Sequence, residues 1–553
     1  MIIKNRRLFL AAIALAGTSA HAQQQVDPGR VDERLRGQPA PPAVAPVEMP
    51  ELPAPEAAPE SAVPLRLTAI QFEGATAVPA DVLNGMAQPY LNRDISLGDL
   101  FRLAEAVTAE YRRRGFVLSR AVVTPQRIEN GVATIQIIEG YIGDVSVEGD
   151  PGGYRPLLEG YLAPVRTERP TSGDDLARAL LLAQDLKGAS VRAVLTPSST
   201  EGAADLSLVV ERQPIEAFVA VDNRGSRWLG PVQIFGGLVF NDLAQLGGRL
   251  ALTAVAAPDE SGELAFVSGA YDQPLGGSGL RMSGFASYAR TKPGDELRVL
   301  AVKGKSFSWG LALQYPILRS RETNVLGRLS WQSRDSSSRN RLIDPVFDDH
   351  IRTVTAELLA NHADRMGGQT TLRASITQGL DLLDATRLGD AAKSRGTASA
   401  MFTRLNGEIT RVQPIYRGLN LLLGATGQWS SESLLASEEF GLGGAQYGRA
   451  YDPSEITGDK GLAGKVELFY TIPARGMGTV EPYVYYEGGR VWQNDLLPGE
   501  RRRSGLRSYG AGLRVGIANR FSLSMEYAKP VRRDVSAESD RDGRIFVSLS
   551  AAY

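Results

Sequence analysis

The chain has 553 residues, enough for several domains, and its 61 basic and 62 acidic residues nearly cancel in charge. This balance gives no electrostatic reason to expect nucleic acid as a partner. Cysteine is absent, which excludes thiol catalysis, thiolate metal sites and disulfides, and suits a chain that crosses an oxidising periplasm.

Residues 1–22 have the pattern of a secretory signal peptide. Positive charges come first, then a short apolar run, then a small-x-small cleavage motif: Lys4, Arg6 and Arg7, Leu8–Ala16, and Ala20-His21-Ala22. Gln23 is therefore the expected mature N-terminus, and an uncleaved anchor helix is the alternative. No later segment approaches about 18 uninterrupted apolar residues, so the remaining way to span a membrane is a closed β-barrel.

Residues 23–63 are expected to form an N-terminal segment and a linker. Most of this stretch is rich in Pro, Ala and Glu, and such a composition buries too little apolar surface to offset the entropy of ordering it. Its first part, DPGRVDERLRGQ, predicts a short helix starting near Asp27.

An internal repeat follows, with a first copy at residues 64–140. An alternating run closes at Gly74, and a helix is predicted from Ser96, with Asp99 as its capping-box partner. Gly115 ends this helix. The apolar face of the helix and the two strands that follow it are Leu100, Leu103, Ala104, Val107 and Tyr111, then Phe116–Val123 and Val132–Ile138, with Asn130-Gly131 as the hairpin turn.

The second copy, residues 141–212, keeps the same order. Its alternating run closes at Gly149, and its helix is predicted from Ser172 to Gly188. The matching positions are Asp175 at the cap, Leu176, Leu180 and Ala183 on the inner face, and strands Ser190–Leu195 and Leu206–Val210. Each copy thus reads β-α-α-β-β, and two in tandem favour a repeated binding module.

From residue 213 to 553, alternating segments recur between turn-forming clusters. One face suits lipid and the other a wet lumen, as in the runs 325–332 and 521–528. At about 21 residues per strand and connection, this region predicts roughly 16 antiparallel strands. The chain ends in a strand whose face Ile545, Val547, Leu549, Ala551 and Tyr553 suits barrel closure, with Phe546 and the terminal aromatic Tyr553 as its candidate residues. A large soluble β-sandwich array is the alternative.

These features together resemble the two-partner secretion transporters (TpsB type, the hemolysin secretion/activation proteins). Both repeats resemble POTRA domains, and Tyr111–Ile142 is similar to the family's first POTRA domain. Val221–Ser226 resembles the start of its barrel. Gly448-Arg449-Ala450-Tyr451 resembles the motif of a loop that folds into the lumen, although Ala450 stands where the family has Gly. Tyr485, Glu487 and Gly489 resemble the inner-wall Phe-x-Asp-x-Gly motif.

The resemblance implies an outer-membrane protein with POTRA domains in the periplasm and no enzyme activity, cofactor or metal. Its partner would be a large secreted adhesin or hemolysin with its own N-terminal secretion domain, bound unfolded by the POTRA domains and threaded through the barrel without ATP. The barrel-assembly machinery would insert the chain, which is expected to be a monomer in outer-membrane lipid. By the family's pattern Arg449 would meet Glu487 inside the lumen, where the two side chains are expected to form two parallel hydrogen bonds and Arg449 to stack on Tyr485. The segment Asp27–Gln38 resembles a plug helix. An insertion factor for other barrels, a passive porin and a barrel enzyme are the alternatives.

Overall fold

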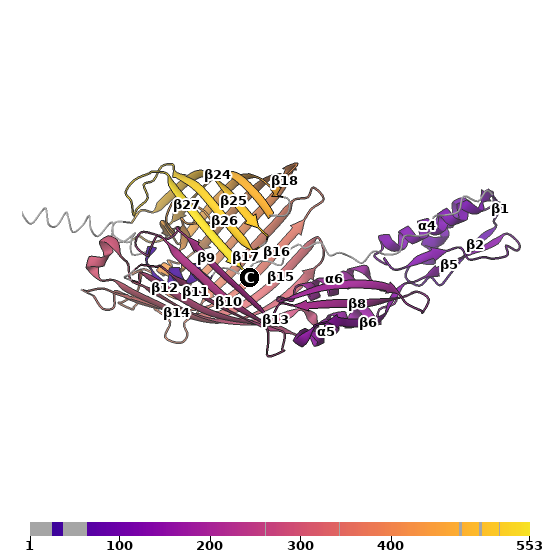
Figure 1. Cartoon of the computed structure of the whole chain (residues 1–553), viewed down its shortest axis with the longest axis horizontal. Helices are drawn as coiled ribbons and strands as arrows, with labels where there is room; N and C mark the ends of the chain where they lie inside the picture. The colour runs from indigo at the N-terminus through magenta and orange to yellow at the C-terminus, as the bar shows by residue number, and fades with distance from the viewer. Residues whose placement is uncertain are drawn as a thin grey trace, which may run out of the picture.

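The computed structural model describes residues 25–36, 63–259, 262–341, 343–474, 478–496, 500–518 and 520–553. The expected signal peptide and the Pro-rich linker lie outside these residues. Figure 1 shows a β-barrel with two small α+β units that project in line from one of its ends. The fold class predicted from the sequence is confirmed.

The first α+β unit lies farther from the barrel. Its elements are β1 (Pro64–Arg66), β2 (Ala69–Glu73), α3 (Ala80–Ala87), β3 (Asp94–Ser96), α4 (Leu97–Arg113), β4 (Arg120–Val122) and β5 (Val132–Ile138). Strands β2, β5 and β4 form a sheet in which β2 runs parallel to β5, while β1 pairs with β3. The capping box of Ser96 and Asp99 is present at the start of α4, as expected.

The strand predicted over 116–123 is wrong in its first half. Gly115 turns the chain with a φ of +94°. The amide of Phe116 then donates to the carbonyl of Tyr111, and the amide of Ser119 donates to the carbonyl of Phe116. These local bonds use the backbone groups that a strand would offer, so only Arg120–Val122 joins the sheet.

The second α+β unit repeats the same order. It consists of β6 (Tyr141–Gly149), α5 (Arg155–Thr167), α6 (Gly173–Gln184), β7 (Ala189–Pro197) and β8 (Ala203–Arg212). The sheet order is β6-β8-β7 with β6 parallel to β8, and Ser172 caps α6 by accepting from the amide of Asp175 at 3.4 Å. Leu158, Leu162, Leu176, Leu180 and Leu208 are part of its buried core. No helix in the described part of the chain is both long enough and apolar enough to cross a membrane.

Sixteen antiparallel strands close the barrel within the described residues, because β22 and β23 pair with the same side of β24 and are two halves of one strand. The bounds are β9 (Ile215–Asp222), β10 (Gln233–Leu243), β11 (Gly248–Ala256), β12 (Leu264–Leu275), β13 (Leu280–Thr291), β14 (Lys303–Arg319), β15 (Thr323–Arg339), β16 (Phe347–Ala363), β17 (Gln369–Gly379), β18 (Thr403–Tyr416), β19 (Leu419–Ser430), β22 (Lys460–Tyr470), β23 (Ile472–Ala474), β24 (Gly478–Trp492), β25 (Arg503–Ile517), β26 (Phe521–Pro530) and β27 (Arg544–Ala552). The barrel closes where β27 pairs with β9, from Ser548 opposite Asp222 to Ala552 opposite Phe218.

Side chains alternate across the barrel wall as the sequence predicts. On β26, Met525 and Tyr527 face outward while Glu526 is buried inside. On β27 the apolar face that ends at Tyr553 lies outside. Phe546, in contrast, points into the lumen, where the guanidinium of Arg224 lies 4.6 Å from its ring centre.

Ion pairs hold the second α+β unit against the short turns of the barrel. Arg319 at the end of β14 binds Asp185 through two parallel hydrogen bonds of 2.8 Å. Arg212 at the end of β8 contacts Asp242 at 2.7 Å. The long loops, such as 380–402 and 431–459, lie at the opposite end of the strands. By the usual asymmetry of outer-membrane barrels, the short turns face the periplasm and the long loops face the outside.

Candidate functional site in the barrel lumen

The connection between β19 and β22, residues 431–459, folds into the barrel. Its hairpin of β20 (Phe440–Leu442) and β21 (Ile456–Gly458) packs against the inner wall formed by β24. Gly489 on β24 makes room for this packing, since an added Cβ would come 2.6 Å from Leu442 and 2.8 Å from Ala463.

The tip of this loop carries the motif Gly448-Arg449-Ala450-Tyr451. Gly448 has a φ of +89°, a conformation that favours glycine. Ala450, which replaces the family's Gly, does not have a positive φ and is fully buried. The alanine is therefore compatible with this loop. The Tyr451 hydroxyl lies 3.2 Å from the carbonyl oxygens of both Arg507 and Arg533, so it ties the tip to the wall and to a neighbouring loop.

The structure brings Arg449 and Glu487 together. The Nε of Arg449 lies 3.3 Å from Glu487, and its guanidinium carbon lies 3.4 Å from the centre of the Tyr485 ring. The amides of Gly448 and Arg449 both donate to the same oxygen of Glu487, the first at 2.8 Å. Ser508 on β25 donates to that oxygen at 2.8 Å. Glu487 therefore fixes the loop backbone as well as the arginine side chain.

The expected pair of parallel hydrogen bonds between the two side chains is wrong. Only Nε reaches Glu487, because Nη1 turns to two other carboxylates, Glu467 at 2.8 Å and Glu526 at 3.2 Å. One arginine thus bridges strands β22, β24 and β26 at once. Sequence reasoning missed both glutamates, although each stands between outward apolar residues on a strand and so must face the lumen.

The cluster is balanced in charge. Arg514 pairs with Glu467 at 2.6 Å and Arg224 pairs with Glu526 at 3.0 Å, so three guanidinium groups meet three carboxylates. Tyr483 adds a hydroxyl that donates to Glu526 at 2.7 Å. Arg449 and all three glutamates are buried. A buried arginine is stable only with such partners, so these ion pairs determine the position of the loop tip in the lumen.

Helix α2 (Pro28–Arg36) also lies in the lumen, the indigo segment inside the barrel in Figure 1. The backbone amide of Arg30 donates to the side chain of Asp27, which fixes the start of the helix where the sequence predicts it. Asp32 is fully buried and accepts hydrogen bonds of 2.6 Å from Ser287 on β13 and from Ser308 on β14. The helix is therefore bound to the wall by polar contacts suited to a wet lumen.

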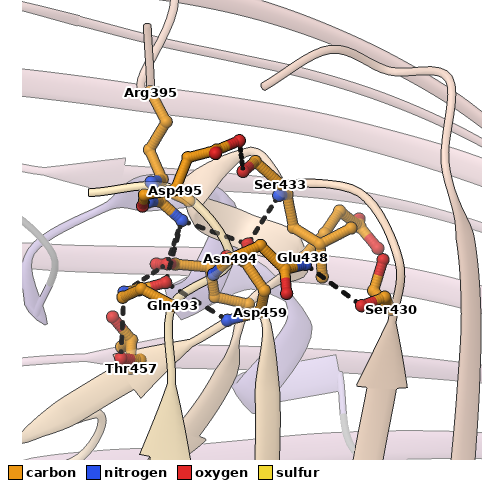
Figure 2. A network of polar contacts seen from close by, with 12 residues as sticks. Arg395, Ser430, Ser433, Glu438, Thr457, Asp459, Gln493, Asn494 and Asp495 are labelled. Atoms are coloured by element: carbon orange, nitrogen blue, oxygen red, sulfur yellow. Dashed lines mark hydrogen bonds and ion pairs between the residues drawn. The ribbon is translucent and has the colours of Figure 1, made fainter. Parts of the chain in front are cut away.

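A second buried arginine, Arg395, connects the loops at the long-loop end of the barrel (Figure 2). It comes from the loop between β17 and β18 and contacts Glu439 at 2.7 Å, Asp459 at 3.1 Å and Gln493 at 3.0 Å, which belong to two other connections. The other oxygen of Glu439 accepts from Arg30 of α2 at 3.3 Å. Glu439 therefore joins the lumenal helix to these loops.

Residues 202–515 match the family described as "Haemolysin secretion/activation protein ShlB/FhaC/HecB", and residues 65–140 match "POTRA domain, ShlB-type". The "Heme/hemopexin transporter protein HuxB" of Haemophilus influenzae (strain 86-028NP) is 21% identical over 83% of this chain and 82% of that protein. The "Outer membrane transporter CdiB" of Escherichia coli O6:K15:H31 is 25% identical over 87% of this chain and 81% of that protein.

Solved structures agree at the level of the fold. CdiB from Escherichia coli superposes with a TM-score of 0.73 at 20% identity, over 97% of this chain and 98% of that chain. The barrel and the two α+β units thus have the same overall fold as that structure. The chain belongs to the haemolysin secretion/activation protein family ShlB/FhaC/HecB, and it is an outer-membrane transporter of two-partner secretion with its POTRA region in the periplasm.

Proposed function

We propose that this chain binds an unfolded secretion domain of its exoprotein at residues 64–212 and passes the exoprotein through the barrel, without ATP and without enzymatic chemistry. Residues 64–140 and 141–212 act as two POTRA domains in this proposal. The assignment of the second unit is supported by the same order of elements and by the same kind of serine cap at its second helix.

An exposed sheet edge supports strand addition by the client. Within the described residues β7 pairs only with β8, which leaves its other edge unpaired. Val194, in the middle of β7, is 37% exposed and would offer an apolar contact beside the free backbone groups. An extended client could use these groups for backbone hydrogen bonds, as in β-augmentation.

The observation that carries the proposal is the filled lumen. Helix α2 and the loop that bears Arg449 occupy the inside of the barrel through polar contacts. A permanently open porin needs neither. Helix α2 would act as a plug that leaves the lumen before the client enters, and folding of the client outside would make passage effectively one-way.

A secretion assay tests this function. The chain would be expressed with a fragment of the exoprotein that carries its N-terminal secretion domain, and the fragment in the medium would be measured. The carbonyl of Gly188 accepts from Gln213 and the amide of Ser198 donates to Ala203. Even-numbered positions of β7 therefore bond to β8, and the amide of Ala193 points to the free edge. Ala193→Pro should therefore abolish secretion while the barrel still inserts, because proline removes this donor of the edge. Ala193→Ser, which keeps the amide, serves as the control. Full secretion by the proline variant would exclude strand addition at β7.

A further inference from the structure

The outer face of the barrel carries a group of cations just beyond its aromatic girdle. On strands β24 and β25, Tyr486 and Tyr509 are direct cross-strand partners and are about half exposed. On the long-loop side of this pair the outward positions are Arg490 on β24 and Arg507 and Arg503 on β25. These strands are neighbours in the wall, as Figure 1 shows.

The height of this group follows from the strand geometry. On β25 the outward positions from Tyr509 to Ile517 are apolar or small, and at about 3.3 Å per residue they span about 26 Å along the strand. A strand tilt of about 40° reduces this to about 20 Å across the membrane, close to the usual apolar band of about 25 Å. Arg507 and Arg490 therefore lie at the level of the outer-leaflet headgroups.

The arginines lie flat on the wall because glycines face them. Arg490 is opposite Gly505, where an added Cβ would come 3.1 Å from the Cγ of Arg490. Arg507 is opposite Gly488, where an added Cβ would come 2.8 Å from the Cγ of Arg507. Both arginines are exposed, and no carboxylate in the described part of the chain forms an ion pair with either of them.

A pocket of about 530 Å³ adjoins this group at the ends of β19, β22 and β24. Trp429 and Trp492 give it an aromatic lining, and Lys460 and Arg502 give it positive charge. The ammonium of Lys460 lies 5.8 Å from the ring centre of Trp429. Sugar rings stack on such aromatic faces, while cations of this kind bind phosphate.

We propose that this surface, formed by Arg490, Arg507, Lys460 and Arg502 with Trp429 and Trp492, binds the phosphorylated lipid A part of a lipopolysaccharide molecule in the outer leaflet. Arg490 and Arg507 hold one phosphate with planar donor pairs, and the acyl chains lie on Tyr486 and Tyr509 below. The pocket with Trp429 takes the sugar and the second phosphate. Basic pockets of this kind at membrane surfaces bind anionic headgroups.

The bound lipid would brace the wall that holds the lumenal cluster. Glu487 lies on β24 and Ser508 on β25, each on the inner face of a strand whose outer face contributes one of these arginines. The carbonyl of Arg507 accepts from the hydroxyl of Tyr451 at the loop tip. One stretch of wall thus carries the lipid outside and the loop inside.

The test measures binding of diphosphoryl lipid A to the full-length protein in detergent, by native mass spectrometry with increasing lipid. Arg490→Gln with Arg507→Gln should weaken binding at least tenfold, about 1.4 kcal/mol. Arg290→Gln with Lys305→Gln is the matched control, because these two outward cations also lie on neighbouring strands near their long-loop ends. That control should leave the affinity unchanged.

Three further ligands distinguish lipid A from other sources of phosphate: dephosphorylated lipid A, phosphatidylglycerol and inorganic phosphate. Each should bind at least tenfold more weakly than diphosphoryl lipid A. Equal binding of phosphatidylglycerol, equal losses in the two variant pairs, or an unchanged affinity of the Arg490 and Arg507 variant would each overturn the proposal. The heat-induced mobility shift of the folded barrel verifies that the variants are folded.

Discussion

Removal of the Arg449 side chain should uncouple the long loop from the barrel wall without preventing insertion. The side chain is 7% exposed and forms ion pairs with three carboxylates whose side chains are 0–3% exposed. In Arg449→Ala, Glu467 keeps Arg514 and Glu526 keeps Arg224, but Glu487 loses the only ion pair that it forms among the described residues. Breaking a buried pair in this way costs about 3–5 kcal/mol. We expect that loss in the free energy of unfolding, and secretion should fall strongly.

The assay is urea unfolding of the barrel in phospholipid vesicles, read together with secretion. Glu487→Ala should also lose secretion, and in a double-mutant cycle the two losses should be non-additive by about 1 kcal/mol or more. Arg449→Lys should rescue poorly, because an ammonium cannot bridge three carboxylates as the planar guanidinium does. Arg514→Ala is the matched control. Its side chain is 38% exposed and pairs with one carboxylate, so its loss should be about 0–1 kcal/mol. Additive losses, or normal secretion by Arg449→Ala, would refute this reasoning.

Three further outcomes can be measured directly. Deletion of residues 25–36 should raise channel conductance in planar bilayers and leave secretion largely intact. Asp32→Ala should raise the conductance to a smaller extent, because two serine hydroxyls of the wall lose their acceptor on the helix. Unchanged conductance in the deletion variant would contradict the proposal that this helix is a plug. Arg319→Ala should loosen the second α+β unit from the barrel, which would be measured as faster hydrogen exchange at α6. An unchanged exchange rate would mean that the contact with Asp185 does not hold this unit in place. Burial acts to raise the pKa of Glu139, but amide donors from Ala77 and Thr76 outweigh it and lower the pKa. Its stabilisation is therefore present above its ordinary pKa and lost as the pH falls through the lower folded value. Proteolysis of the first unit should rise in acid for the wild type, and a Glu139→Gln variant with the same acid response would exclude this origin.

Local signals predicted most of the fold. The serines that cap α4 and α6 were identified from a capping pattern, which depends only on neighbours in the chain. The outward faces of β26 and β27 followed from alternation, because lipid and water impose opposite demands on the two sides of the wall. The ends of strands were harder to predict. The start of β4 is an example, because backbone hydrogen bonds formed just after Gly115 compete with those of the sheet.

The lumenal cluster was predictable only in part. Family motifs pointed to Arg449 and Glu487, and alternation placed Glu487 on the inner face. Their detailed geometry depends on Glu467 and Glu526, which come from strands far apart in the sequence and carry no motif. Arg395 has no local signal at all, because its partners belong to connections that meet only when the barrel closes.

The joint between the second α+β unit and the barrel has a mechanical consequence. β8 ends at Arg212 and β9 begins at Ile215, so only two residues separate this unit from the first barrel strand. β9 is also one side of the closing seam, which has five paired residues, from Ser548 to Ala552 on β27. A pull on the periplasmic unit thus reaches the wall at a short ladder of backbone bonds. The protein's response to tension should therefore begin as a shear of β9 against β27 rather than as a deformation of the whole cylinder.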